Sequence, residues 1–445
     1  MKLIIENIRT FAGRHEIPIS PLTIVTGENS AGKSTLLAAL SLVTRASGFP
    51  FYPRFNDPPY SLGTFSSIAH RDSPPRPRPP GQRGLSFSLG YEKEIAPEGM
   101  TKALATYDNE KGAVRMSRFS GTTPFVDLEI ALDRTVNDAY LATLGTAEGE
   151  IADMPLSERF IDRIQPNVTV AILSQLLNSG ALDADGAAIA GPRPPQEQKV
   201  LMALVSQPDA FAPRENSLSA APVRTRPSRV YDPATESYKP EGDHVPFMLA
   251  RLFLDEAKRE SMSPVRSAIE AFGQESGLFK RIAVRRYGGR RSVASPFRLL
   301  VDMWGARIDL VDVGYGVSQS LPLLVDSLVR PDVELLLIQQ PEVHLHPRAQ
   351  AALGSFFATL VSTRFKRFVI ETHSDHLVDR VRLEISKGTL DPSLVSLIYL
   401  EREGLETVPY HITFDTLGNV IGAPPGYRSF FLREQLELLG QQPDD

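Results

Sequence analysis

Eight residues near the start of the chain have the types and the spacing needed to hold a phosphate chain. Residues 27–34 read Gly-Glu-Asn-Ser-Ala-Gly-Lys-Ser and match the pattern G-x-x-x-x-G-K-[ST] at every fixed position. The two glycines let successive backbone N–H groups point at phosphate oxygens, and a following helix offers its positive N-terminus to the same anion. Lys33 is placed to reach the β- and γ-phosphates, and Ser34 to hold Mg²⁺.

The segments on either side of this loop agree with a nucleotide site. Residues 22–25 form a short β-rich run that enters the loop, and residues 34–44 carry apolar side chains at helical spacing after it. Strand, loop and helix in this order distinguish a phosphate-binding loop from a chance match. We therefore expect ATP with Mg²⁺, bound by the loop residues Gly27, Asn29, Ser30, Ala31, Gly32, Lys33, Ser34 and Thr35.

Length and composition restrict the class of protein. The chain has 445 residues, enough for two or three domains, and its 42% hydrophobic and 23% charged residues are typical of a globular protein. The net charge of −5 indicates no overall nucleic-acid affinity, so any such contact must come from a local patch. The absence of cysteine excludes disulfides, zinc–thiolate sites and cysteine nucleophiles.

The sequence also predicts where the protein resides. No apolar run approaches the roughly 18 residues of a membrane-spanning helix. Charged side chains interrupt the N-terminus too early for a signal peptide. We expect a cytoplasmic protein that makes no membrane contact.

The patterning along the chain predicts a split domain. Short alternating strands between 85 and 132 indicate an antiparallel meander, whereas 155–180 and 196–206 have helical patterning. From 333 onward, apolar strands alternate with helices and end in polar residues, as in a parallel α/β core with a site at its C-terminal strand edge. We expect a head formed by 1–145 and 240–400, a helical insertion at 146–239 with a long Pro/Ser/Arg-rich loop, and a C-terminal extension at 401–445.

Three polar motifs occur in this second half. Gly-Tyr-Gly-Val-Ser-Gln at 314–319 leads into a helix. The strand at 333–338 ends in Gln-Gln-Pro-Glu-Val-His-Leu-His-Pro at 339–347. The next strand ends in Glu-Thr-His-Ser-Asp-His at 371–376.

The order of these motifs resembles the ABC-type ATPase heads of the SMC/RecF/OLD group and, more narrowly, bacterial AAA-family ATPases encoded in phage-defence loci. The resemblance covers about 1–70 and 220–430. It implies an α/β fold, an ABC-type P-loop ATPase head with an antiparallel β-subdomain and an inserted helical lobe. It also implies a homodimer, because the signature motif, here Gly316, Ser318 and Gln319, contacts the nucleotide of the opposite subunit. His373 matches the switch histidine, which senses the γ-phosphate and helps position the attacking water.

The chain departs from the resembled group at the Walker B strand. Such heads usually end this strand with an acid for Mg²⁺ and then a catalytic Glu, but this chain has Gln339 and Gln340. An amide is neither a base nor an anionic ligand. We assign Gln339 to the metal beside Ser34, Gln340 and His373 to catalysis, and the nearest carboxylate, Glu342, to the missing base. Hydrolysis is then expected to be slow, partner-stimulated or absent. The Q-loop glutamine of the group has no clear match, and His70 and Gln82 are the candidates.

Other readings of these residues stay open. The side chains of Glu342, His344, His346, His373 and His376 are potential ligands for a metal. The segment after residue 373 contains no Asp-x-Asp pair, so we do not expect the Toprim nuclease domain of OLD enzymes.

Three functions are compatible with the sequence. The preferred one is an ATPase that controls a separately encoded effector protein in an anti-phage or toxin-like system. The second is a hydrolysis-deficient scaffold gated by nucleotide. The third is a RecF-like clamp on duplex DNA, because residues 276–301 carry seven basic side chains and no acidic one. The DNA contact would come from Arg285, Arg286, Arg290 and Arg291.

Overall fold

The computed structural model describes residues 1–45, 48–71, 85–95, 99–124, 126–133, 139–146, 149–156, 215–232, 237–254, 262–287, 295–303, 305–364 and 366–428. The chain divides into two compact units. The first contains Met1–Ile19, Thr35–Asn216 and Arg402–Val408, and the second contains Ser20–Ser34, Ser217–Glu401 and Pro409–Asp445.

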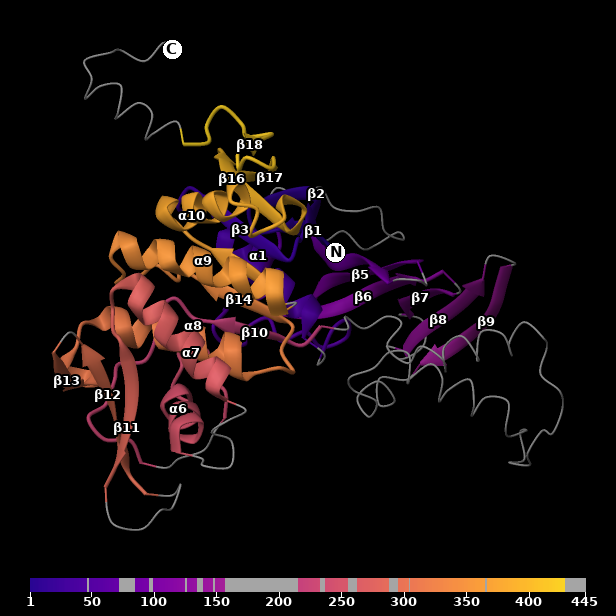
Figure 1. Cartoon of the computed structure of the whole chain (residues 1–445). Coiled ribbons are helices and arrows are strands. Elements are labelled where there is room, and N and C mark those ends of the chain that lie inside the picture. Colours follow the sequence, from indigo (N-terminus) through magenta and orange to yellow (C-terminus); the bar gives the residue numbers. More distant parts are fainter. Residues whose placement is uncertain are drawn as a thin grey trace. The chain divides into compact units, whose positions relative to one another are not determined.

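The first unit is built on an antiparallel sheet of eight strands in the order β2-β1-β4-β5-β6-β7-β8-β9 (Figure 1). Its strands are β1 (Lys2–Ile8), β2 (Phe11–Pro18), β4 (Ser86–Ile95), β5 (Gly99–Glu110), β6 (Ala113–Thr122), β7 (Asp127–Asp133), β8 (Ala139–Thr146) and β9 (Gly149–Leu156). The helical elements are α1 (Lys33–Thr44), whose first two residues belong to the second unit, and α2 (Phe65–Ile68). Aromatic side chains form much of the core, and the buried rings of Phe87 and Tyr107 stack with centroids 5.3 Å apart.

The predicted meander is confirmed, and it is longer than expected. Strands β8 and β9 continue it to residue 156, beyond the boundary expected at 145. Apart from residues 155 and 156, which belong to β9, the predicted helices at 155–180 and 196–206 lie outside the described residues.

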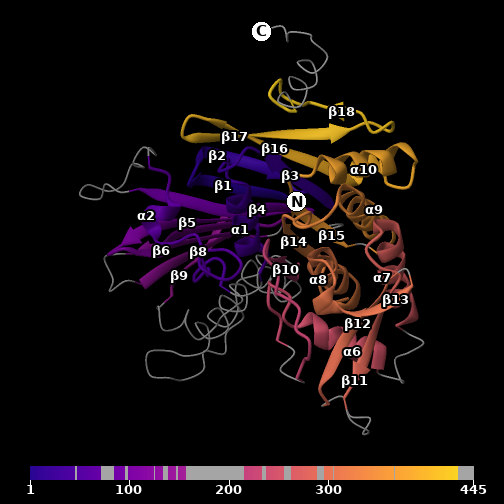
Figure 2. The ribbon, with the colours of Figure 1, turned by 90° about the vertical axis from the view of Figure 1, so that its left-hand side faces the viewer.

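The second unit is built on a largely parallel sheet in the order β10-β14-β15-β3-β16-β17-β18. Its strands are β3 (Leu22–Gly27), β10 (Ser217–Ala220), β14 (Leu335–Gln339), β15 (Arg367–Glu371), β16 (Val395–Glu403), β17 (Glu406–Phe414) and β18 (Val420–Ile421). Every residue of β14 is buried, as expected for a strand covered on both faces. Strands β16 and β17 run side by side in Figure 2.

One strand of this sheet lies where the sequence predicted an insertion. Strand β10 pairs in parallel with β14, in the register Ser217↔Leu335 to Ala220↔Ile338. Part of the segment 146–239 therefore belongs to the core sheet rather than to a helical lobe. Four residues with two serines give no clear strand periodicity, which is why the pattern missed it.

Helices and a small antiparallel sheet complete the second unit. They are α6 (Val245–Leu254), α7 (Ser263–Ser276), β11 (Arg281–Arg286), β12 (Phe297–Met303), β13 (Ala306–Asp309), η2 (Leu310–Asp312), α8 (Tyr315–Val329), α9 (Pro347–Arg364), α10 (Asp375–Ser386) and η3 (Pro392–Leu394). Helix α8 is buried on all sides from Gly316 to Leu328. The predicted basic hairpin is present as β11 paired with β12, but its Gly-Gly turn lies outside the described residues.

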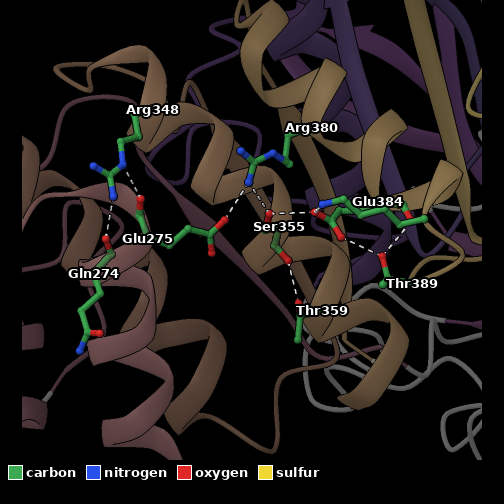
Figure 3. A network of polar contacts seen from close by, with 9 residues as sticks. Gln274, Glu275, Arg348, Ser355, Thr359, Arg380, Glu384 and Thr389 are labelled. Atoms are coloured by element: carbon green, nitrogen blue, oxygen red, sulfur yellow. Dashed lines mark hydrogen bonds and ion pairs between the residues drawn. The ribbon is translucent and has the colours of Figure 1, made fainter.

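Polar contacts fix α10 against α7 and α9 (Figure 3). Arg380 donates to the Glu275 carboxylate at 2.7 Å and to the Ser355 hydroxyl at 2.9 Å. A side chain at Gly354 would place its Cβ 2.8 Å from the Leu377 carbonyl oxygen, so only glycine permits this approach of α9 to α10. Because α10 begins two residues after His373, these contacts also fix the segment that carries that histidine.

Candidate nucleotide site

The phosphate loop follows a path that its residue types permit. Gly27, Ser30 and Gly32 all have positive φ angles, of 138°, 64° and 91°. A Cβ added to Gly27 would lie 2.2 Å from the carbonyl oxygen of Leu400 in β16, the parallel neighbour of β3. The glycine is therefore required both by backbone conformation and by the packing of the sheet.

Lys33 has its ammonium group folded onto this loop. The Nζ atom donates to the carbonyl oxygens of Gly27 at 2.9 Å and Glu28 at 2.6 Å. Burial lowers the pKa of Lys33, and the nearby carboxylates of Glu371, Glu28 and Glu342 oppose that change. A cation with only neutral carbonyls as direct partners is suited to exchange them for phosphate oxygens.

A buried acid that the sequence patterns did not predict lies beside the loop. The Ser34 hydroxyl lies 3.0 Å from both carboxylate oxygens of Glu371, and the Gln339 amide donates to the same carboxylate at 3.3 Å. Glu371 ends β15, where it is the register partner of Gln339 at the end of β14. The negative charge missing from β14 is thus supplied by its neighbour. The sequence signal for Glu371 was an acid that follows the apolar residues 368–370. The resembled group instead carries its acid on the preceding strand, where this chain has Gln339.

Three oxygen-bearing groups, linked by hydrogen bonds to Glu371, lie where the sequence places Mg²⁺. They are the Ser34 hydroxyl, the Glu371 carboxylate and the Oε1 atom of Gln339. This amide oxygen is buried and has no hydrogen-bond partner among the described residues. Hydroxyl, carboxylate and amide oxygens are the ligand types that Mg²⁺ prefers, so Ser34, Glu371 and Gln339 would hold the ion when it is bound. The residues therefore fit the ion.

After Gln339 the backbone makes a turn, and the Glu342 side chain contacts the residues that follow β15. Gln340 has a φ angle of 41°, unusual for a residue other than glycine, and its N–H donates to the Glu371 carbonyl at 2.7 Å. The Glu342 carboxylate accepts from the Thr372 hydroxyl at 2.8 Å and from the His373 N–H at 2.7 Å. Glu342 therefore holds Thr372 and the backbone of His373 in place.

His373 is exposed at the same edge of the sheet. Burial of part of its ring lowers its pKa, the positive charge of Lys33 lowers it further, and Glu342 and Glu371 oppose both effects. The ring of His373 is neutral at pH 7 and offers one N–H donor.

The signature residues lie on α8 and contact other parts of the second unit. Gly316 packs close to the His344 carbonyl, since an added Cβ would lie 3.2 Å from that oxygen. The Ser318 hydroxyl donates to the Tyr315 carbonyl at 3.0 Å. Among the described residues, the hydrogen bonds of Ser318 and Gln319 are therefore made within α8 and to Arg224, not to the phosphate loop.

Arg224 is a second residue that the sequence analysis missed. Its side chain is 3% exposed and donates to the Gln339 carbonyl at 3.2 Å. Burial lowers the pKa of Arg224 to about 10, and the Glu342 carboxylate opposes this shift. The guanidinium stays charged at neutral pH. A lone arginine in an irregular segment gives no sequence signal for burial.

The remaining predicted residues have other surroundings. In the first unit, the Thr35 hydroxyl accepts from Arg9 at 3.3 Å, and the buried His70 ring contacts the Arg9 carbonyl. Gln82, Arg290 and Arg291 lie outside the described residues. Arg285 on β11 is exposed and Arg286 is partly so.

The alternative metal site of Glu342, His344, His346, His373 and His376 is not formed. Nowhere in the described part of the chain do three His, Asp or Glu side chains gather as they would around a metal. Glu342 binds Thr372 and the His373 backbone instead, and His344 packs against the Tyr315 ring with 5.7 Å between the ring centroids.

No helix in the described ranges is long and apolar enough to cross a membrane.

Two family models match parts of the chain that contain these motifs. Residues 171–379 match a family model described as "AAA domain, putative AbiEii toxin, Type IV TA system", and residues 2–55 match one described as "AAA domain". No curated protein matched the chain.

Solved structures similar to the chain include SMC heads. One is an SMC head bound to the C-terminal winged-helix domain of ScpA, with 10% identity, a TM-score of 0.44, and coverage of 93% of this chain and 97% of that one. Another is the SMC head domain from Thermotoga maritima, with 10% identity, a TM-score of 0.40, and coverage of 95% and 98%. A third, from Pyrococcus furiosus with ScpA bound, has 10% identity, a TM-score of 0.39, and coverage of 99% and 98%.

Proposed function

Since residues 2–55 and 171–379 match AAA-domain family models, we propose that the chain binds ATP with Mg²⁺ at the C-terminal edge of the β14-β15-β3 sheet and hydrolyses it. The observation that carries this proposal is the contact of Ser34 with Glu371 beside Gln339. It supplies the buried anion that the sequence of β14 lacks. Bound Mg²⁺ would neutralise phosphate charge and orient the γ-phosphate.

The other residues act around that centre. Lys33 exchanges its loop carbonyls for β- and γ-phosphate oxygens, a charge-assisted contact. Gln340, held in a strained turn, orients the attacking water through its amide. His373 donates its N–H to the γ-phosphate. Glu342 positions His373 through the His373 backbone N–H, and its carboxylate is the group proposed to accept the proton of the water.

The test is ATP binding by calorimetry and steady-state phosphate release, each with and without Mg²⁺. Native protein should bind ATP in a Mg²⁺-dependent way, and Lys33→Ala should abolish binding. Lys387→Ala, which removes an exposed lysine from an i,i+3 ion pair with Glu384, is the matched control. Equal binding by native protein and Lys33→Ala would exclude this site.

We further propose that two copies close on ATP through the start of α8. Gly314 and Tyr315 are exposed there, so a second copy can reach this turn. The closed homodimer would control a separately encoded effector, and the toxin–antitoxin description of the matched family supports an anti-phage or toxin-like setting. Sedimentation with and without Mg²⁺-ATP tests the dimer, using Ser318→Ala as the variant that should fail to close. Co-purification with the product of a neighbouring gene tests for the effector.

A hydrolysis-deficient scaffold is the second candidate, favoured by the amides Gln339 and Gln340. Binding and dimerisation without phosphate release would establish it, and steady release in native protein would exclude it. We also propose a DNA contact through the exposed face of β11 as an alternative role. Binding to duplex that weakens steeply with salt, and that is lost in Arg285→Ala/Arg286→Ala, would support this third function.

A further inference from the structure

Arg224 joins the signature helix to the end of β14. Its backbone N–H donates to Oε1 of Gln319 at 3.3 Å, and its carbonyl accepts from Nε2 of the same side chain at 3.4 Å. Its guanidinium Nη2 donates to the Gln339 carbonyl at 3.2 Å. One residue thus contacts both elements, through main chain on one side and side chain on the other.

Further hydrogen bonds connect Gln339 to the phosphate loop. The Gln339 amide donates to the Glu371 carboxylate at 3.3 Å, and that carboxylate accepts from Ser34 at 3.0 Å. A continuous series of hydrogen bonds therefore links Gln319, Arg224, Gln339, Glu371 and Ser34.

Packing alone does not explain why a buried arginine occupies position 224. Its Nε and Nη1 atoms are buried and have no hydrogen-bond partner among the described residues. Unpaired buried donors of a charged group are unfavourable, and an apolar side chain of similar size usually stabilises such a position better. The next residue is anchored, because the Thr225 N–H donates to the Glu241 carbonyl at 2.8 Å. The guanidinium is therefore held at a fixed place despite its incomplete pairing.

We propose that Arg224 is a positioning residue that couples the metal end of the phosphate loop to the first turn of α8. The inference rests on the proposed nucleotide site. Mg²⁺ and phosphate draw on Ser34, Glu371 and Gln339, and a displacement of Gln339 is transmitted through Arg224 to Gln319. The same turn of α8 begins at Tyr315, which is exposed next to the exposed Gly314, and the dimer proposal places these two residues against the second copy. ATP binding at the loop thus prepares α8 for closure.

Hydrogen–deuterium exchange of the full chain, with and without Mg²⁺ and the slowly hydrolysed analogue ATPγS, tests this coupling. In native protein, we expect slower exchange at the amides of 27–35 and a change of at least about fivefold at 315–320, the lower end of typical site-to-site coupling. In Arg224→Gln, nucleotide should still slow amide exchange at 27–35, whereas exchange at 315–320 should not change. Arg226→Gln is the matched control, because Arg226 lies two residues away and is exposed. It should behave as native.

A second variant separates coupling from misfolding. Gln319→Leu removes both contacts to the Arg224 main chain and leaves the guanidinium in place. In this variant, nucleotide should still slow amide exchange at 27–35 but should leave exchange at 315–320 unchanged. The proposal is overturned if 315–320 respond in both variants as in native protein, or if they never respond although the loop does. If the loop itself is silent in native protein, the proposed nucleotide site fails first, and that result is distinguishable from a failure of coupling.

Discussion

The hydroxyl of Ser34 and the carboxylate of Glu371 lie 3.0 Å apart, although 337 positions separate them in the chain. Strand β15 pairs in parallel with β3, which brings its last residue beside the loop that follows β3. The acid of the site thus comes from the strand between the phosphate loop and the glutamine-ended β14.

Glu371→Gln should weaken Mg²⁺-dependent ATP binding by about 10–100-fold, the usual effect of losing a group that supports a metal site. The amide keeps the shape and can still accept from Ser34, but it removes the charge. Calorimetry with and without Mg²⁺ measures the effect. Glu275→Gln, whose carboxylate contacts Arg380 on another helix, is the matched control. An unchanged Mg²⁺ dependence would remove Glu371 from the site.

Glu342→Gln should reduce the free energy of unfolding by about 1–3 kcal/mol. The carboxylate accepts from Thr372 and from the His373 N–H, and an amide can present only one oxygen to these two donors. Denaturant unfolding measures the loss. If Glu342 is also the base, phosphate release should fall in the same variant by far more than ATP affinity. Unchanged stability together with unchanged release would contradict both roles.

Acidification should charge His373 only at a pH below its usual pKa of 6.5, because burial and Lys33 lower that pKa. Between the lowered pKa and 6.5 the unfolded chain binds more protons than the native chain, so native stability decreases as pH falls through this window. Thermal unfolding from pH 8 to 5 should therefore show a smaller acid loss in His373→Gln than in native protein. The rate of phosphate release should also begin to decline on the acid side only at a pH below 6.5. His376→Gln serves as the control, and identical profiles for native protein and His373→Gln would refute the assignment.

Gly27→Ala should prevent ATP binding and destabilise the second unit. Its Cβ would meet the Leu400 carbonyl oxygen at 2.2 Å, and neither backbone can move without disturbing the β3–β16 pair. Gly112→Ala is a matched control, because Gly112 also has a positive φ, of 92°, but nothing lies within 4 Å of its added Cβ. Calorimetry and thermal unfolding compare the two. Similar losses in both variants would show that φ, and not the contact with β16, sets the requirement.

Residue patterns were sufficient to predict the phosphate loop, the antiparallel meander and the alternation of strands and helices in the second half. These features are local, because a strand, a turn and a helix are encoded by the spacing of nearby residues. The positions of Lys33 and Ser34 at the start of α1, of Gln339 at the end of β14 and of His373 just after β15 followed from the same local patterns.

The placement of the Glu371 carboxylate beside Ser34 depends on the tertiary structure. The sequence pointed to Glu342 as the base because it is the nearest carboxylate after Gln340, whereas Glu371 reaches Ser34 through the lateral order of β14, β15 and β3. Strand order and register depend on long-range pairing, which spacing along the chain does not encode. The burial of Arg224 against Gln339 and the addition of β10 to the sheet were hidden for the same reason, since each depends on a partner more than 100 positions away.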